Sequence, residues 1–312
     1  MERPLRADAS VSILVWGVKR MLKQIWRARS GYLFILPKFA VFLVFVFIPI
    51  IWSFVVSFQE YRIFDTVWVG FDNFRNAIAD DLFLTAVQNT LRYAVVVMPA
   101  TVIIALVLAS LIHPLRRRAQ TFYRAAFYLP TVASTVVLAM VWRWIFQTRF
   151  GLANFFLTSV GLEPVNWLHS SQWALRSVII MSVLTPPGVG VILYLAAMNS
   201  IPDSLYEAAT IDGANRLTQW WRITLPLLKP TTLYLMIVST IGSFQVFDQV
   251  MLMTQGGPGY ATTTIVHRIY NTAFRDFQFG YAGAMSMMLF AAIIVLALIQ
   301  SRLLSSDVEY KG

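Results

Sequence analysis

The feature that most constrains this chain is a series of long apolar stretches separated by polar links. A helix that crosses a bilayer needs about 20 apolar residues, because the hydrocarbon core is about 30 Å thick. Hydrophobic residues make up 58% of the 312 residues, and the mean hydropathy is +0.64, well above that of a soluble domain. We therefore predict an all-α membrane protein with six transmembrane helices, at about 32–58, 90–112, 126–146, 175–198, 231–253 and 282–304.

The links between these stretches differ in charge, and the difference predicts the orientation. Four arginines and no acid occupy the link 114–124, whereas the link 59–86 carries five acidic residues and two arginines. Because basic links face the cytoplasm, both termini and the link 199–230 are expected inside. The formal net charge of +10 then reflects cytoplasmic basic residues and does not indicate nucleic-acid binding.

The expected domain organisation has three parts. Residues 1–30 combine an apolar face with a basic face that includes Lys19, Lys23 and Arg27, a pattern typical of an amphipathic helix at the membrane surface. A six-span domain follows over 31–305, and a cytoplasmic tail covers 306–312.

The fourth apolar stretch is interrupted between Thr185 and Gly190, where Pro186, Pro187 and Gly188 follow one another. Broken membrane helices free backbone groups and often line binding sites. A simple proline kink is an equally good interpretation. We include Thr185 and Gly188 in a predicted substrate path.

The fifth stretch carries small and polar residues on one helical face. At helical spacing i, i+3, i+4 and i+7, Ser239, Gly242, Ser243 and Val246 share this face, with Gln245 and Asp248 beside it. Close helix packing explains the small residues as well as substrate contact does. Close packing does not explain the amide of Gln245 and the carboxylate of Asp248, because their unmet hydrogen bonds would cost roughly several kcal/mol in lipid. The predicted substrate path therefore includes Ser239, Gly242, Ser243, Gln245, Val246 and Asp248.

No motif for covalent or metal chemistry occurs in the chain. It has no cysteine, its three histidines lack metal-ligand spacing, and it contains neither a phosphate-binding loop nor a dinucleotide-binding fingerprint. We expect no catalytic residue, no metal, no cofactor and no ATP hydrolysis by this chain. An ion-gradient-driven transporter remains a rival, although Asp248 alone is a candidate ion ligand and no repeat is seen.

A short polar module lies between the fourth and fifth stretches. Nothing breaks a helix from Asp203 to Asp212, and Gly213 stands where a helix ends in left-handed geometry. Residues 215–222 can form a second helix, and Pro226 and Pro230 predict an elbow before the next span. The sequence thus predicts a compact helix-turn-helix on the cytoplasmic surface.

This module resembles the EAA loop of binding-protein-dependent ABC importer permeases. The match comprises Glu207-Ala208-Ala209, three residues, Gly213, nine residues, then Ile223-x-Leu225-Pro226. Further segments resemble the sugar-importing branch, the family of the maltose transporter's larger permease and the glycerol-3-phosphate permease, and extend the resemblance over most of 30–305: Tyr123-Arg124-Ala125, Phe127–Pro130, Phe247-Asp248, Thr254–Gly259, Thr262–Thr264 and Ala273–Ala282.

The resemblance implies a type I importer permease fold without the extra N-terminal spans and the large external insert of the maltose protein. It also implies a multi-pass inner-membrane protein with four kinds of partner: a second, similar permease, two cytoplasmic ATPases, an extracytoplasmic binding protein, and a sugar or, alternatively, glycerol-3-phosphate. The ATPase would contact Glu207, Ala208, Ala209, Asp212 and Gly213. Family asparagines in the fifth span are replaced here by Ser243 and Val246, so the same sugar does not follow.

Overall fold

The computed structural model describes residues 29–61 and 66–304. These separate into two compact units, one ending at Val55 and one beginning at Val56, and each is described by itself. Nearly all of the expected surface helix over 1–30, and all of the tail over 306–312, lie outside the described residues.

The first unit is a single apolar rod. Helix α2 (Arg29–Phe42) continues through a π-helical turn, η1 (Leu43–Phe47), into α3 (Ile48–Val56). The stretch Leu33–Val56 is 24 residues long and apolar enough to cross a membrane. Lys38 is its single charged residue, so the rod matches the first predicted span.

The second unit contains three more helices of spanning length. They are α5 (Asp81–Ile112), the pair α9 (Ala174–Leu184) and α10 (Gly188–Asn199), and α17 (Phe279–Leu304). Two bent pairs qualify if each counts as one span: α6 (Arg117–Val132) with α7 (Thr135–Ile145), and the helix Arg216–Leu227 with α14 (Lys229–Phe244). The described residues thus hold four to six candidate spans.

The structure confirms one predicted break and adds two. The fourth span is interrupted at Thr185–Pro187, as its prolines predict. The third was predicted as a single helix, but it breaks after Val132 with a bend of 92°. Ser134 starts the new helix, because its hydroxyl accepts a hydrogen bond from the Val136 amide at 3.3 Å.

The prediction of one continuous helix over 231–253 is wrong. Helix α14 ends at Phe244, the segment 245–247 leaves helical geometry, and α15 (Asp248–Met253) begins a new direction. The Thr264 hydroxyl donates to the Val246 carbonyl at 2.9 Å, which satisfies a backbone group that the break leaves free. No proline marks this break, so the sequence pattern did not reveal it.

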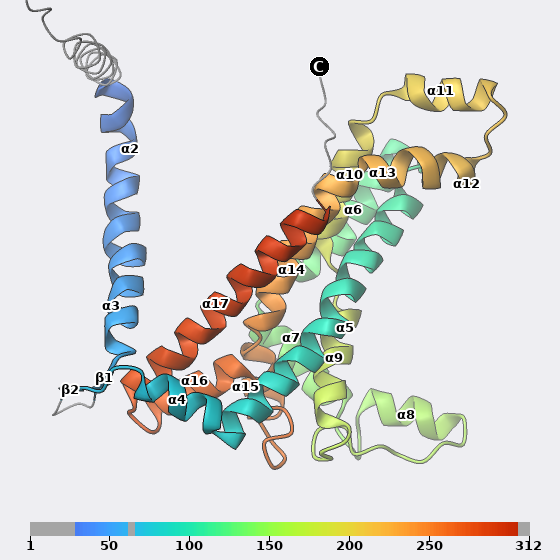
Figure 1. The fold of residues 1–312 in the computed structure, drawn as a ribbon. Helices are drawn as coiled ribbons and strands as arrows, with labels where there is room; N and C mark the ends of the chain where they lie inside the picture. Colours follow the sequence, from blue (N-terminus) through green and yellow to red (C-terminus); the bar gives the residue numbers. More distant parts are fainter. Residues whose placement is uncertain (1–28, 62–65, 305–312) are drawn as a thin grey trace, which may run out of the picture. The chain divides into compact units, whose positions relative to one another are not determined.

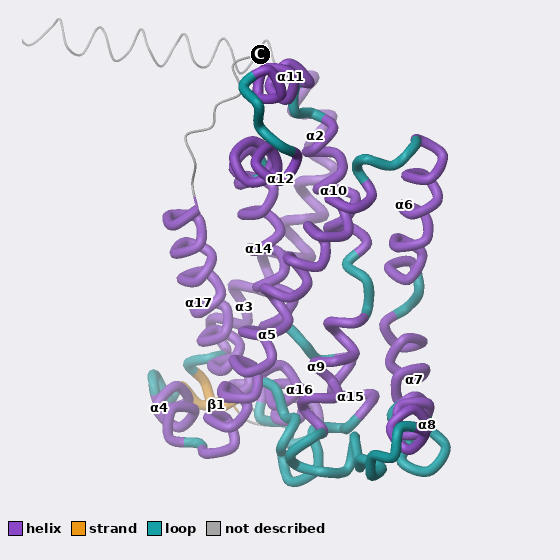
Figure 2. The backbone as a smooth tube through the Cα atoms, turned by 90° about the vertical axis from the view of Figure 1, so that its right-hand side faces the viewer, coloured by secondary structure: helices purple, strands orange, loops and turns teal. Residues whose placement is uncertain are grey.

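The short elements gather at opposite ends of the long helices. Strands β1 (Gln59–Tyr61) and β2 (Thr66–Trp68) pair antiparallel, with Gln59 opposite Trp68, and α4 (Asp72–Ala79) follows them. Helices α4, α8 (Leu152–Ser159), α15 and α16 (Ile265–Phe274) lie at one end, and α11 (Asp203–Ile211) and α12 (Arg216–Gln219) at the other (Figure 1). The acidic link and the start of α6, which lies within the basic link, are likewise at opposite ends (Figure 2).

Helix α5 organises the core of the second unit. Its N-terminal part, with Tyr93 and Val97, packs in one apolar cluster with α7, α9 and α15. Its C-terminal part, with Ala105 and Ala109, packs against α10 and α14. Small residues on α5 allow these close approaches, which is how helices associate where lipid removes the hydrophobic driving force. The sites described below are built on this helix.

Candidate functional site

Two adjoining cavities lie beside the break in the fourth span. Their volumes are about 320 Å³ and 390 Å³. Both are lined by side chains from α5, from α7, from the α9–α10 break and from α14, and they share Thr101, Leu138, Thr135, Thr185, Pro187 and Ser239. The break therefore does open a cavity, which a simple kink would not require.

Hydroxyl groups dominate the polar lining. The oxygens of Thr101 and Ser239 lie 2.9 Å apart, and the Tyr93 hydroxyl donates to Ser182 at 2.8 Å. The Thr185 hydroxyl donates to the carbonyl of Met181 at 2.8 Å, where the broken helix ends. Among the described residues that line the two cavities, none is charged. The site offers hydrogen-bonding groups and apolar surface without a fixed charge.

Five of the eight predicted path residues line these cavities. Thr185, Ser239, Gly242 and Ser243 border the smaller one, and Gly188 borders the larger. A Cβ atom added at Gly242 would meet nothing within 4 Å, so this glycine faces open space and is not a packing contact. Gly188 differs, because a Cβ atom there would collide with the backbone of α6 at Phe127 and Tyr128. It lets α10 approach α6 closely.

The other three predicted path residues do not line either cavity. Val246 is 3% exposed and packs in an apolar cluster with Val250. Gln245 lies in the break, and Asp248 is the exposed first residue of α15. The helical register that grouped them with Ser239 ends at Phe244, which is the physical reason for the discrepancy.

Sequence reasoning missed five polar residues of the smaller cavity: Tyr93, Thr101, Thr135, Ser182 and Gln249. Tyr93 and Thr101 are two helical turns apart on the second span, so their shared face was a detectable signal. Gln249 was not detectable, because it reaches the cavity only after the chain changes direction at residues 245–247.

The cytoplasm-directed module predicted at 203–230 folds as two helices joined by a tight turn. Helix α11 ends at Ile211, Gly213 has φ +77°, and the Asn215 side chain caps α12 by accepting from the Thr218 amide at 2.8 Å. Helix α12 continues through η2 (Trp220–Thr224) and α13 (Leu225–Leu227), and the chain bends by 62° into α14. The elbow was therefore correctly predicted.

Side-chain hydrogen bonds hold this module together. The Tyr206 and Thr224 hydroxyls lie 2.9 Å apart, and Gln219 donates to the Thr210 hydroxyl at 2.9 Å. Trp220 donates from its indole nitrogen to Ser110 of α5 at 3.0 Å. The residues predicted to contact the ATPase remain largely exposed: Glu207, Ala208, Asp212 and Gly213, with Ala209 half-buried.

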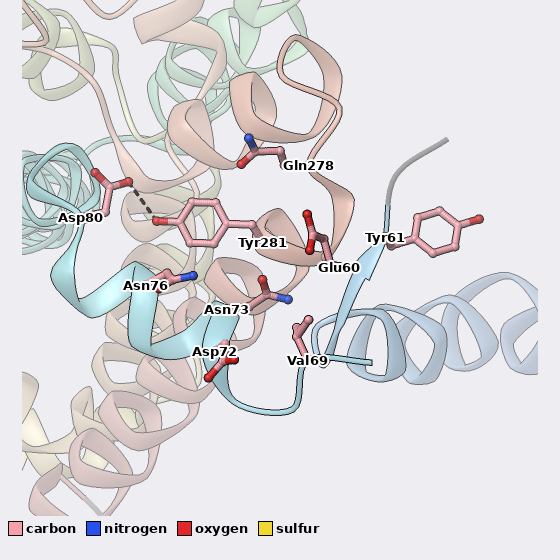
Figure 3. Close-up of a pocket in the computed structure, with 10 residues that line it drawn as sticks. Glu60, Tyr61, Val69, Asp72, Asn73, Asn76, Asp80, Gln278 and Tyr281 are labelled. Carbon is pink, nitrogen blue, oxygen red and sulfur yellow. Dashed lines mark hydrogen bonds between the residues drawn. The ribbon is translucent and has the colours of Figure 1, made fainter. Parts of the chain in front are cut away.

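The opposite end carries an acidic pocket of about 530 Å³, lined by β1, α4 and the start of α17. Figure 3 shows Asp80 and Tyr281 directed toward each other; the tyrosine hydroxyl donates at 2.9 Å. Arg268 donates to the same carboxylate at 3.1 Å. Burial raises the pKa of Asp80, but the bonds from Tyr281, the Leu82 amide and Arg268 outweigh it, so this pKa lies below its ordinary value.

The glycine-rich segment 254–264 is an ordered loop hydrogen-bonded to α5. Asn89 donates to the carbonyls of Tyr260 and Thr263 at 3.1 and 3.0 Å, and Thr90 accepts from the Ile265 amide at 3.0 Å. In the described part of the chain, no group of three His, Cys, Asp or Glu side chains is placed to hold a metal ion.

Comparison with known proteins decides the family. The model of the family "Binding-protein-dependent transport system inner membrane component" matches residues 99–308. The chain belongs to this family. The matched range includes the α11–α12 module and the lining of the central cavities except Tyr93 and Val97.

Relatives of this family member include transport permeases of known systems. The arabinooligosaccharide transport permease AraP of Bacillus subtilis (strain 168) is 32% identical over 91% of this chain and 90% of its own. The sn-glycerol-3-phosphate transport permease UgpA of Escherichia coli (strain UTI89 / UPEC) is 30% identical over 93% of this chain and 99% of its own.

A solved structure has the same fold. A chain of a bacterial alginate ABC transporter, crystallised in complex with an alginate pentasaccharide-bound periplasmic protein, superposes with a TM-score of 0.80. It is 27% identical, and the match covers 91% of this chain and 96% of that chain. The present fold is therefore that of an inner-membrane ABC importer permease.

Proposed function

We propose that this family member is the transmembrane subunit of an ATP-driven importer for a neutral saccharide. We infer the class of solute from the lining of the two central cavities. Among the described residues, this lining presents hydroxyls and one amide but no charged side chain. A sugar needs hydrogen-bonding partners and an apolar surface for its ring face. Tyr93, Leu138 and Pro187 supply such a surface beside the hydroxyls.

Glycerol-3-phosphate, which the name of UgpA indicates as the solute of that relative, fits this lining less well. A phosphate taken out of water needs cationic partners, because an unpaired buried charge costs more than an uncharged cavity can offset. The lining supplies none. The uncharged solute is therefore our first choice, and the phosphate ester is the alternative.

The assembly we propose contains a second, similar permease, two cytoplasmic ATPases and an extracytoplasmic solute-binding protein. Support for the binding protein comes from the family description and from the alginate complex. Support for ATPase contact comes from the exposed EAA segment on α11 and from the bonds that tie α11 to α12 and η2, and η2 to α5. Closure of the ATPases would move α11, and the broken spans would then rearrange around the cavity.

The proposed orientation follows from charge. Both termini and the α11–α12 module lie in the cytoplasm, and the acidic pocket beside Asp80 faces outside. All spans then belong to one six-span domain, in which each bent pair crosses the membrane once.

Copurification and reconstitution test this proposal. The chain is purified with its genetic neighbours, reconstituted in proteoliposomes, and assayed for uptake of radiolabelled neutral sugars and of glycerol-3-phosphate, with the binding protein present. We expect ATP-dependent uptake of a neutral saccharide that also stabilises the binding protein in a thermal-shift screen. Uptake driven by an ion gradient without ATP, or uptake of glycerol-3-phosphate alone, would refute the proposal.

A further inference from the structure

A fourth opening of the second unit shares no lining residue with the two central cavities or with the acidic pocket. It is a groove of about 730 Å³ along the seam between α5 and α9, next to Ala261 of the glycine-rich loop. Figure 1 shows the two helices adjacent along this stretch. The groove has a chemistry of its own: two arginines, a serine and a glutamine combined with aliphatic side chains, namely Arg92, Arg176, Ser171, Gln172, Leu91, Val95, Val96, Leu175 and Ile179.

The polar side chains of the groove all lie toward one end, together with Leu91 and Leu175, and its other end is lined by aliphatic side chains alone. Arg92 and Val95 are one helical turn apart on α5, and Arg176 and Ile179 are one turn apart on α9. Both helices begin at the end where α4 and α8 lie (Figure 2). On each helix the arginine is therefore nearer that end, and the aliphatic side chain lies about 4.5 Å deeper along the axis.

When Ile112 is taken as one boundary of the hydrocarbon core, a residue count along α5 places Arg92 at the other. Helix α5 has 32 residues and is longer than a membrane requires. At about 1.5 Å per residue, the hydrocarbon core of about 30 Å corresponds to some 20 residues. Counted back from Ile112, these residues begin at Tyr93, which places Arg92 at the boundary. Val95 is 69% exposed and Val96 is 46% exposed, so they present an apolar surface just inside it.

Neither arginine is neutralised within the described residues. The described ion pairs involve Arg75 and Arg268, and no acid lies within 4.0 Å of Arg92 or Arg176. The guanidinium of Arg176 sits 5.1 Å from the ring centre of Trp173, a cation–π contact that holds it in place without cancelling its charge. Two fixed positive charges at the surface of a membrane attract anionic groups.

We propose that this groove binds an anionic phospholipid of the outer leaflet, with its phosphate between Arg92 and Arg176 and an acyl chain against Val95, Val96 and Ile179. Charge complementarity selects the anionic headgroup, and the graded polarity of the groove selects a molecule with an apolar tail. A soluble phosphate would leave the aliphatic half bare. A partner protein would need acidic side chains to pair with the two arginines. Burying those carboxylates in the apolar groove would carry a desolvation penalty. The leaflet rests on the orientation proposed above.

Photolabelling tests the occupant. The assembled importer is placed in nanodiscs of equal phosphatidylcholine and phosphatidylglycerol, with a trace of either lipid carrying a photoreactive acyl chain, and labelled peptides are mapped by mass spectrometry. We expect the phosphatidylglycerol probe to label 91–96 and 175–179 several-fold more than the phosphatidylcholine probe. Equal labelling by the two probes would overturn the proposal. Labelling does not depend on transport, so a wrong solute assignment would leave it unchanged.

Variants separate the arginines from the apolar walls. Arg92→Gln with Arg176→Gln should lower phosphatidylglycerol labelling by about an order of magnitude, because each surface arginine contributes about a fivefold preference. Arg92→Lys with Arg176→Lys should retain labelling, because both positive charges are kept. This variant tests the proposal even when the glutamine variant fails to assemble. Arg143→Gln, an exposed arginine at the end of α7 outside the groove, is the matched control and should not change it.

Two further results would refute the lipid as occupant. If millimolar inorganic phosphate displaced the probe at constant ionic strength, the site would be one for a soluble anion. If a cysteine at Val95 formed crosslinks to the second permease in high yield, a protein would cover the groove.

Discussion

The hydroxyl oxygens of Thr101 and Ser239 lie 2.9 Å apart, although 138 residues separate them in the chain. This contact joins α5 to α14 where both central cavities meet. The Thr101 hydroxyl also donates to the carbonyls of Val97 and Met98, in the preceding helical turn, at 2.9 and 3.0 Å. The two side chains are thus held in position when no solute is bound, as a preorganised binding site requires.

The first prediction concerns this pair. Thr101→Val and Ser239→Ala should each lower solute uptake about 5- to 20-fold, because each removes one hydrogen-bonding group worth about 1–2 kcal/mol from the cavity. Uptake is measured in proteoliposomes with the binding protein present. Ser286→Ala is the control, since its hydroxyl bonds only to Ala282 of its own helix. Unchanged uptake in both test variants would place the solute elsewhere.

The second prediction fills the cavity at Gly242. Since a Cβ atom there meets nothing within 4 Å, Gly242→Ala should be tolerated and should favour the helix by about 1 kcal/mol. Gly242→Phe should abolish uptake by occupying the cavity while the complex still assembles and hydrolyses ATP. Ala292→Phe on the exposed face of α17 is the control. If Gly242→Phe transported normally, the smaller cavity would not be on the path.

The third prediction concerns the turn after α11. Gly213 has φ +77° and no neighbour within 4 Å, so a substitution there is opposed by backbone geometry alone. Gly213→Asn should retain transport, because asparagine tolerates left-handed geometry, whereas Gly213→Val should lose most of it. Glu207→Ala should likewise reduce solute-stimulated ATPase activity without changing the affinity for the binding protein. Equal activity of the Asn and Val variants would argue against a geometric role.

The fourth prediction follows from the lowered pKa of Asp80. A carboxylate whose folded-state pKa lies below its ordinary value of 3.8 stabilises the fold at higher pH. That stabilisation is lost as the pH falls through the lowered value. Asp80→Asn should therefore lower Tm at pH 7 and flatten its decline in acid, as followed by tryptophan fluorescence.

Asp72→Asn is the matched control for Asp80. Its partner Arg75 lies 3.4 Å away, but both side chains are more than half exposed, and such surface pairs contribute little. Comparable losses of Tm in the two variants would show that the Asp80 network has no special role in stability.

The fifth prediction is the orientation. Because the chain lacks cysteine, single cysteines at Ser12, Gln120 and Asp72 can be probed with an impermeant thiol reagent in spheroplasts. Only the cysteine at 72 should react, since the acidic link is expected outside and the basic link inside. Labelling at 120 would invert the proposed topology.

Local pattern determined much of this fold. The apolar runs predicted where helices of spanning length occur, and Pro186 and Pro187 predicted the break in the fourth span. Gly213 predicted the turn after α11, and the EAA segment predicted the family. These inferences succeed because each depends on residues within one or two helical turns: proline removes a backbone donor, glycine permits positive φ, and lipid requires continuous apolar surface.

Only the tertiary structure decided which polar residues share a cavity. The break after Phe244 has no sequence marker. It removes Val246 from the predicted path and brings Gln249 into the cavity lining. The bond from Thr264 to the Val246 carbonyl, which satisfies that break, comes from 18 residues away. Likewise the pairing of Thr101 with Ser239 depends on how α5 packs against α14. Helical periodicity orders side chains along one helix, but the packing of several helices decides which of those faces meet.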